Sequence, residues 1–97
     1  MDRSEILSRL TGHRSDVERG FGATRLALFG SAARDELRDD SDIDILVAFD
    51  GPATVARYFG LKDYLEALLG RRIDLVTEKG LKPRARLHVE RDLVDVT

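Results

Sequence analysis

Apolar residues recur at the spacing of an α-helix in two long segments of the chain. The first segment is residues 2–19, in which Asp2 and Glu5 have the spacing of an N-terminal capping pair. Gly12 weakens the middle of this segment, but the apolar residues on either side of it fall near one face. The second segment is residues 54–69, where apolar residues again recur at intervals of three and four. The pattern therefore predicts two amphipathic helices.

Shorter apolar segments predict strands. Residues 23–29 are mostly apolar, whereas residues 42–47 and 72–77 place single acidic residues among aliphatic ones. In residues 42–47, alternation sends the three β-branched residues to one face of the strand and the two acidic residues to the other. Residues 93–96 are expected to add a final strand at the edge of the sheet.

Two short helices complete the predicted elements. Residues 32–37 are helix-like and run into the polar loop 38–41, and Pro83 suits the first turn of a basic helix that continues to about Val89. Strands separated by helices predict an α/β (α+β) fold, in which a small mixed sheet is flanked by helices. The 42% hydrophobic content of the 97 residues is enough for one core, so we expect a single domain over residues 1–97.

Composition narrows the class of protein and the kind of metal site. The formal charge is −2, from 16 basic and 18 acidic residues, which argues against direct nucleic-acid binding. No apolar run approaches the roughly 18–20 residues of a membrane span, and the first residues do not form a signal peptide, so we expect a cytoplasmic protein. Cysteine is absent and His13 and His88 are isolated, so oxygen ligands and a hard cation such as Mg²⁺ are expected.

Three aspartates are candidates for that cation. Asp42 and Asp44 are one residue apart in a predicted strand, so their side chains would emerge about 6.5–7 Å apart on the same face. Asp74, flanked by apolar residues on another strand, is placed to join them. Carboxylates around one or two Mg²⁺ ions resemble sites that activate an attacking oxygen and stabilise phosphoryl transfer. A structural explanation remains open, since such acids also end strands, and Asp74 can pair with Arg71 or Arg72.

Gly30 and Ser31 follow the first predicted strand and offer groups that bind phosphate. Gly30 lets the backbone come close to a phosphate, the N–H groups at the start of the next helix attract anions, and the Ser31 hydroxyl can donate to a phosphate oxygen. Taken alone, a Gly-Ser pair after a strand is most often only a turn. Arg34 is a further candidate for phosphate binding, although a local ion pair with an acid such as Asp39 is the commoner role.

The joint occurrence of these features resembles a known family. The Gly-Ser turn, ten further residues, an Asp-x-Asp pair and a later strand aspartate are similar to the nucleotidyltransferase superfamily of the DNA polymerase β type. The sequences GSAAR at residues 30–34 and SDIDILV at residues 41–47 are closer still to the minimal nucleotidyltransferases, small prokaryotic proteins reduced to a catalytic domain. The resemblance covers roughly residues 23–90.

This resemblance implies a polymerase β-like nucleotidyltransferase fold and a role for each candidate residue. Asp42 and Asp44 would bind two Mg²⁺ ions, and Asp74 would complete the metal site and help to activate an acceptor hydroxyl. At Asp35 many relatives have a glycine, so this chain places an acid near the predicted phosphate site, which would weaken nucleotide affinity. The nucleotide would be held by Gly30, Ser31, Arg34 and Ser41.

The resemblance also implies a partner, because the chain lacks the helical domain with which larger relatives grip base and acceptor. Minimal nucleotidyltransferases are typically encoded beside a HEPN-domain ribonuclease toxin. The expected function is an antitoxin that forms a hetero-oligomer with this toxin and transfers AMP from ATP to one of its hydroxyl groups, with tyrosine as the first candidate. Two alternatives remain open: a non-catalytic antitoxin that acts by contact through the basic residues 79–91, and a nucleotidyltransferase for small molecules.

Overall fold

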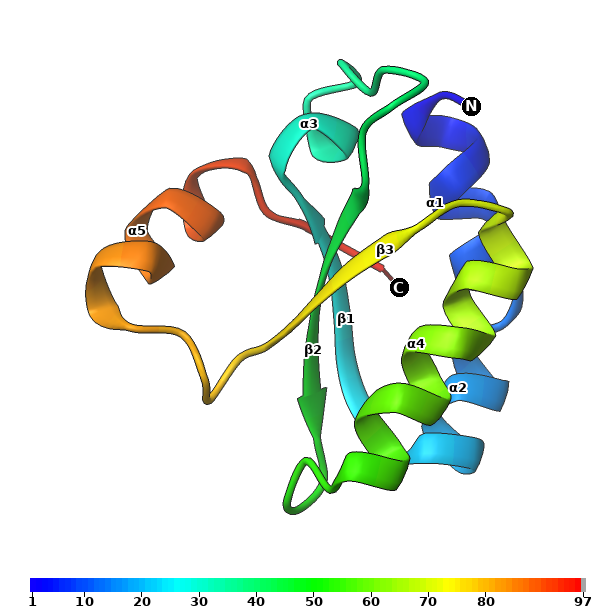
Figure 1. Ribbon diagram of the computed structural model, residues 1–97, viewed down its shortest axis with the longest axis vertical. Coiled ribbons are helices and arrows are strands. Elements are labelled where there is room, and N and C mark those ends of the chain that lie inside the picture. The colour runs from blue at the N-terminus through cyan, green and yellow to red at the C-terminus, as the bar shows by residue number, and fades with distance from the viewer. Residues whose placement is uncertain (97) are drawn as a thin grey trace.

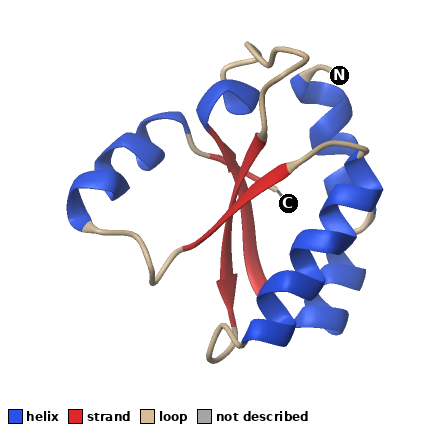
Figure 2. Ribbon diagram, in the orientation of Figure 1, coloured by secondary structure: helices blue, strands red, loops and turns tan. Residues whose placement is uncertain are grey.

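The computed structural model of the protein describes residues 1–96, in which helices flank both faces of one sheet (Figures 1 and 2). The strand order is β3-β2-β1-β4; β2 is antiparallel to β1 and parallel to β3, and β4 is antiparallel to β1. The predicted small mixed sheet with flanking helices is therefore confirmed. The elements are α1 (Arg3–Gly12), α2 (Arg14–Phe21), β1 (Ala23–Phe29), α3 (Gly30–Ala33), β2 (Ile43–Phe49), α4 (Val55–Leu69), β3 (Ile73–Thr77), α5 (Pro83–Asp92) and β4 (Val94–Asp95).

The predicted first helix is in fact two helices. The predicted cap is present, because the Asp2 carboxylate accepts a hydrogen bond from the Glu5 amide at 2.8 Å. The helix stops after Gly12, and His13 takes a non-helical conformation between α1 and α2, with φ −113° and ψ 10°. The backbone freedom of glycine makes this the weakest point of the segment, so tertiary packing bends the chain there. Apolar residues of both helices remain buried.

The helix predicted over residues 32–37 is wrong in both position and length. α3 is a single turn that starts at Gly30, the residue directly after β1. It cannot continue because Asp35 has φ 61°, in the left-handed region, and the Glu36 amide returns to the Ser31 carbonyl at 2.8 Å. The loop predicted at 38–41 follows, and β2 begins one residue later than expected, so that Asp42 lies just outside the strand.

One face of the sheet carries the main hydrophobic core. Figure 1 shows α1, α2 and α4 on that side, and the longest of them, α4, has Thr54 as its N-cap and Gly70 as its C-cap. Val55, the first apolar residue of the predicted helix 54–69, is 76% exposed at the start of α4 and so lies outside its buried face. Within residues 1–96 no helix has the length and apolar character needed to cross a membrane. The largest fully buried side chains are Ile6, Leu10, Val17, Leu26, Leu28, Ile43, Ile45, Val47, Leu61, Leu65 and Leu69.

The opposite face of the sheet is covered by α5 (Figure 1). A small cluster holds this helix, in which Val89 of α5 is buried with Ala27 of β1 and Leu46 of β2. The helix begins with Pro83, as predicted, but continues to Asp92, three residues beyond the predicted end. Because strand side chains alternate between faces, this thinly covered side of the sheet is also the side to which the acidic residues of β2 and β3 point.

Candidate active site

A row of three side chains crosses the sheet on its α5 side. Asp44 of β2 is the register partner of Phe29 on β1 and of Asp74 on β3. Register partners on neighbouring strands point to the same face of a sheet, so the two carboxylates lie side by side. The structure therefore brings together Asp44 and Asp74, which are distant in the sequence, at the end of β1 from which α3 starts.

Gly30 makes room for the Asp44 side chain. It has φ 65°, a conformation that residues with a side chain rarely adopt, and a Cβ atom at this position would overlap the Asp44 carboxylate. The sequence suggested that glycine here admits a phosphate. The structure adds a different requirement: without glycine at position 30, the Asp44 carboxylate would be displaced.

The pair of carboxylates changes the acidity of Asp44. Burial raises its pKa to about 6, and a hydrogen bond with the Asp74 carboxyl together with the charges of Asp74 and Asp42 acts in the same direction, while Arg34 opposes it. Two carboxyl groups on neighbouring strands form a site where a divalent cation can take the place of a proton. The donor set consists of oxygen atoms and suits Mg²⁺.

Asp42 directly precedes β2 and pairs with an arginine. Its Oδ1 atom forms an ion pair with Nε of Arg72 at 3.1 Å, so Arg72 pairs with Asp42 rather than with Asp74. In the part of the chain that the structure describes, no three acidic or histidine side chains form a preformed metal cluster. The Asp42 carboxylate is thus engaged through Oδ1 by an exposed arginine.

Ser41 belongs to the loop that leads to Asp42. Its hydroxyl accepts a hydrogen bond from the Arg38 amide at 3.3 Å. Arg71 bridges the two ends of the segment 38–41, since its Nη2 atom donates to the carbonyl groups of Arg38 and Ser41 at 2.5 and 2.8 Å. These contacts position the residue before β2. Neither Ser41 nor Ser31 lines the cavity that opens above Asp44.

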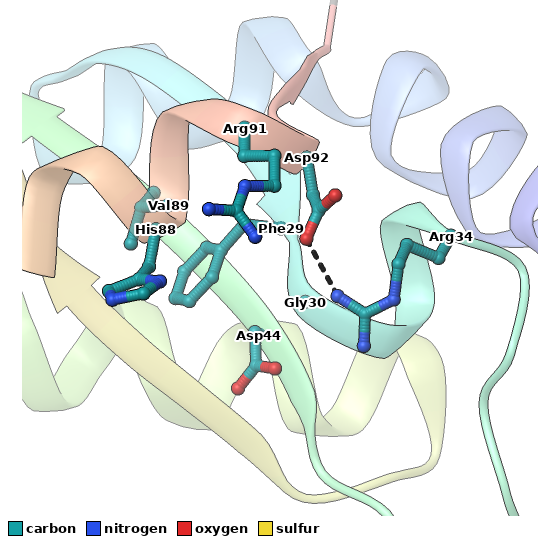
Figure 3. Close-up of a pocket in the computed structure, with 8 residues that line it drawn as sticks. All are labelled: Phe29, Gly30, Arg34, Asp44, His88, Val89, Arg91 and Asp92. Carbon is teal, nitrogen blue, oxygen red and sulfur yellow. Dashed lines mark hydrogen bonds and ion pairs between the residues drawn. The ribbon is translucent and has the colours of Figure 1, made fainter.

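A cavity of about 270 Å³ opens above Asp44 (Figure 3). One wall comes from the end of β1 and from α3, and the other comes from α5. The basic composition of α5 predicts a surface for a partner and does not indicate that this helix lines the candidate site, as it does in the structure. The lining residues are Phe29, Gly30, Arg34, Asp44, His88, Val89, Arg91 and Asp92.

An ion pair joins the two walls of this cavity. Arg34 Nη1 lies 2.6 Å from Asp92 Oδ2 (Figure 3). Arg34 Nε lies 3.3 Å from Glu36 Oε2. Arg34 thus forms an ion pair, as the structural alternative suggested, but with these acids instead of Asp39. Its hydrogen bond to Asp92 is the main cause that raises the pKa of the guanidinium, which keeps its charge.

Comparison with known proteins gives consistent matches along the chain. The model of a family described as "Nucleotidyltransferase domain" matches residues 10–96. "Protein adenylyltransferase MntA" of Thermococcus cleftensis is 42% identical over 92 residues, which are 95% of this chain and 93% of the relative. A solved structure assigned as a minimal nucleotidyltransferase has a TM-score of 0.82 and 42% identity, over 97% of this chain and 95% of that one.

A more distant match shares the fold. It is a chain from the complex of a tri-AMPylated Shewanella oneidensis HEPN toxin with MNT antitoxin, with a TM-score of 0.68 and 18% identity. The match covers 94% of this chain and 71% of that chain. At this identity the likeness concerns the arrangement of helices and strands alone.

Proposed function

This chain belongs to the nucleotidyltransferase domain family, as a minimal nucleotidyltransferase, and on that premise we propose that it transfers AMP from ATP to a hydroxyl group of a partner protein. The observation that carries the proposal is the pairing of Asp44 with Asp74 on adjacent strands, beside a cavity bordered by Gly30. The name of the Thermococcus relative, a protein adenylyltransferase, supports AMP as the group and protein as the acceptor.

The three aspartates are proposed to hold two Mg²⁺ ions. Asp44 and Asp74 are already register partners on adjacent strands. Asp42 is proposed to join them when its carboxylate leaves Arg72. When bound, the metal supplies positive charge that activates the attacking oxygen and stabilises the phosphate in the transition state. Because Asp74 is exposed, an acceptor hydroxyl from another molecule can reach it and give up its proton there.

The nucleotide is proposed to lie between Asp44 and α5. The acceptor oxygen attacks the α-phosphorus of ATP, a new O–P bond forms, and the bond to the bridging oxygen breaks so that pyrophosphate leaves with the electron pair. Gly30, Ser31 and Arg34 are the proposed phosphate ligands. Ser41 would contribute from the loop before β2, where its hydroxyl now accepts a hydrogen bond from the backbone.

The proposed partner is a HEPN-domain ribonuclease toxin, which this chain would neutralise in a cytoplasmic hetero-oligomer. The Shewanella complex, in which a HEPN toxin carries AMP and is bound to MNT antitoxin, supports this class of acceptor. The position of Asp74 agrees with it, since the side chain is exposed at the open edge of the site. A tyrosine hydroxyl of the toxin is the proposed acceptor.

The test is to incubate the protein with labelled ATP, Mg²⁺ and the HEPN toxin encoded beside it. Label is expected on the wild-type toxin but not on toxin variants that lack the acceptor tyrosine. When Asp44→Asn or Asp74→Asn replaces the wild-type transferase, the yield of labelled toxin is expected to fall at least about 100-fold. The catalytic proposal is wrong if no label is transferred and if wild-type and Asp44→Asn proteins neutralise the toxin equally well.

Neutralisation by contact is the second candidate, and the surface of α5 favours it. Leu87 is 70% exposed on this helix, close to the exposed Arg84. An apolar side chain among basic ones fits an acidic partner surface with an apolar pocket. If contact alone neutralises the toxin, Leu87→Asp or Arg84→Glu will abolish neutralisation while Asp44→Asn will leave it intact. The catalytic mechanism predicts loss of neutralisation with Asp44→Asn.

A further inference from the structure

Arg34, the proposed phosphate ligand that follows the Gly-Ser turn, already forms ion pairs with two carboxylates. Arg34 contacts the carboxylates of Asp92 and Glu36, at 2.6 and 3.3 Å. Both contacts are charge-assisted hydrogen bonds, so two of the five N–H donors of Arg34 are occupied and two carboxylates already balance its charge. A second cation in the cavity would therefore add to the positive charge that Arg34 can offer to a nucleotide.

Arg91 is a cation that has no such competitor. It lies on α5 one residue before Asp92, its side chain lines the same cavity, and within residues 1–96 it forms no ion pair with a carboxylate. Figure 3 shows its guanidinium reaching from α5 into the space above Asp44, on the opposite side from Gly30. A free guanidinium that faces a cavity can offer several donors to one phosphate group.

We propose that Arg91 binds the pyrophosphate part of ATP, that is, the β- and γ-phosphates. The inference rests on the proposed function, in which Asp44 and Asp74 mark the position of the α-phosphorus. The remaining cavity runs from that point to α5 and is lined by two guanidinium groups, Arg34 and Arg91. This lining suits phosphate oxygens better than a nucleobase. For stacking against a base, it offers the phenyl ring of Phe29.

A pyrophosphate ligand at this position would also serve the reaction. When the bond between the α-phosphorus and the bridging oxygen breaks, negative charge grows on the departing pyrophosphate. A fixed positive charge beside that group stabilises the transition state more than the bound substrate. Arg91 thus becomes a substrate-binding residue from a helix that lies outside the Gly-Ser and Asp-x-Asp motifs.

The experiment measures equilibrium binding of ATP and of AMP to the protein without its partner, in Mg²⁺, by calorimetry. Arg91→Gln is expected to weaken ATP binding about tenfold and to leave AMP binding within about twofold of wild type, since AMP lacks the β- and γ-phosphates. Arg84→Gln is the matched control, because Arg84 is exposed on the same helix but does not line the cavity. It removes the same charge and is expected to change neither affinity more than about twofold.

Each other result overturns the proposal in a recognisable way. Equal losses of ATP affinity in Arg91→Gln and Arg84→Gln would mean that the helix acts only through its net charge. Equal losses of ATP and AMP affinity in Arg91→Gln would place Arg91 at the AMP part of the ligand. A wild-type protein that binds neither nucleotide would overturn the nucleotide pocket and the role of Arg91 together, whereas normal ATP binding by Arg91→Gln overturns Arg91 alone.

A second variant and a stability measurement keep this test independent of folding. Arg91→Lys retains the charge but loses the forked donors, so its ATP affinity is expected between those of wild type and Arg91→Gln. Arg91 is exposed, so the urea midpoint of Arg91→Gln is expected to match that of wild type. A lowered midpoint together with weakened AMP binding would show a structural role and would contradict the proposal.

Discussion

The two faces of the sheet differ in what covers them and in what they carry. On one face α1, α2 and α4 bury a continuous set of aliphatic side chains, whereas on the other α5 buries Val89 against Ala27 and Leu46. The aspartates of the candidate site lie on the second face. A carboxylate inside the first face would lose its hydration without compensation, so the thin cover over Asp44 is what allows it to remain close to solvent and substrate.

Alternation along β2 produces this division from a single strand. Ile43, Ile45 and Val47 enter the core, while Asp44 and Leu46 face α5. A shift of one residue in the register would exchange these two sets, so the core that stabilises the fold also fixes the direction of the Asp44 carboxylate. One face of the sheet therefore carries the stabilising core, and the other face carries the candidate site.

The largest expected effect is a loss of core packing. Leu65→Ala, at a fully buried position of α4, is expected to lower the free energy of unfolding by about 2–5 kcal/mol. Val89→Ala, on the α5 side, removes less buried surface and is expected to cost about 1.5 kcal/mol. Urea titrations of both variants give the measurement. Equal costs would show that α5 is held as firmly as α4 and would remove the contrast between the faces.

The next largest effect is the difference in stability and in AMP transfer between alanine variants of two glycines that have almost the same backbone conformation. Gly30 and Gly70 have φ 65° and 67°, but a Cβ at Gly30 would overlap the Asp44 carboxylate. At Gly70, no described residue other than its chain neighbours lies within 4 Å of such a Cβ. Gly70→Ala is expected to cost about 1–2 kcal/mol of stability from the backbone alone and to leave AMP transfer unchanged. Gly30→Ala is expected to cost about 2–3 kcal/mol and to abolish transfer.

Chemical unfolding and transfer assays on the two alanine variants give the answer. If Gly30→Ala retains transfer at the rate of Gly70→Ala, the close approach of Asp44 to the turn is unimportant for the site.

The third effect is a dependence of stability on pH that arises on the α5 face. Because the pKa of Asp44 is raised to about 6, the folded state holds this proton more tightly than the unfolded state, in which the pKa is about 4. The free energy of unfolding therefore falls as pH rises from about 4 to about 6 and stays lower above that range. Since Asp44 is only half buried, solvent reduces the loss to about 1 kcal/mol.

Asp44→Asn is expected to remove this loss, so the variant should be about 1 kcal/mol more stable than wild type at pH 7.5 and nearly equal to it at pH 4. Asp63→Asn, at an exposed acid of α4, is the control and is expected to leave the wild-type pH profile unchanged. Mg²⁺ is expected to raise the melting temperature of wild type but not of Asp44→Asn. A pH profile unchanged by Asp44→Asn would contradict the raised pKa.

The smallest effect concerns Asp35, which ends α3 in the left-handed conformation and accepts a hydrogen bond from the Arg3 amide at 2.9 Å. Asparagine tolerates this conformation and keeps the acceptor, so Asp35→Asn is expected to change stability by less than about 0.5 kcal/mol. Removal of the nearby negative charge is expected to strengthen ATP binding about twofold. Weaker binding in Asp35→Asn would contradict the idea that this acid lowers nucleotide affinity.

The parts of the fold that follow from local pattern were predictable. β1 has the predicted bounds, and Asp44 faces away from the core because alternation requires it. The length of α3 was not predictable from helix propensity, since it depends on the conformation of Asp35. The break at His13 was also missed, because packing against the sheet decides which weak point in a helix gives way.

The α5 wall of the cavity was missed for a different reason. His88 and Arg91 approach the candidate site only because Val89, between them, packs on the sheet. A sequence pattern shows that Val89 is apolar but not which surface it contacts. The basic composition of the helix suggested a partner-binding surface instead, and no motif links its residues to the Gly-Ser turn.

The single buried anchor of α5 has a consequence for motion on slow timescales. Val89 is the one buried side chain of α5, and the Arg34–Asp92 ion pair adds a partly exposed contact. Such a helix can detach while the rest of the molecule stays folded, so its amide protons are expected to exchange with solvent faster than those of α4. Such detachment widens the cavity without disturbing the sheet or the aspartates. For a nucleotide bound as proposed, the rate of release is expected to depend on how often Val89 leaves its contact with Ala27 and Leu46.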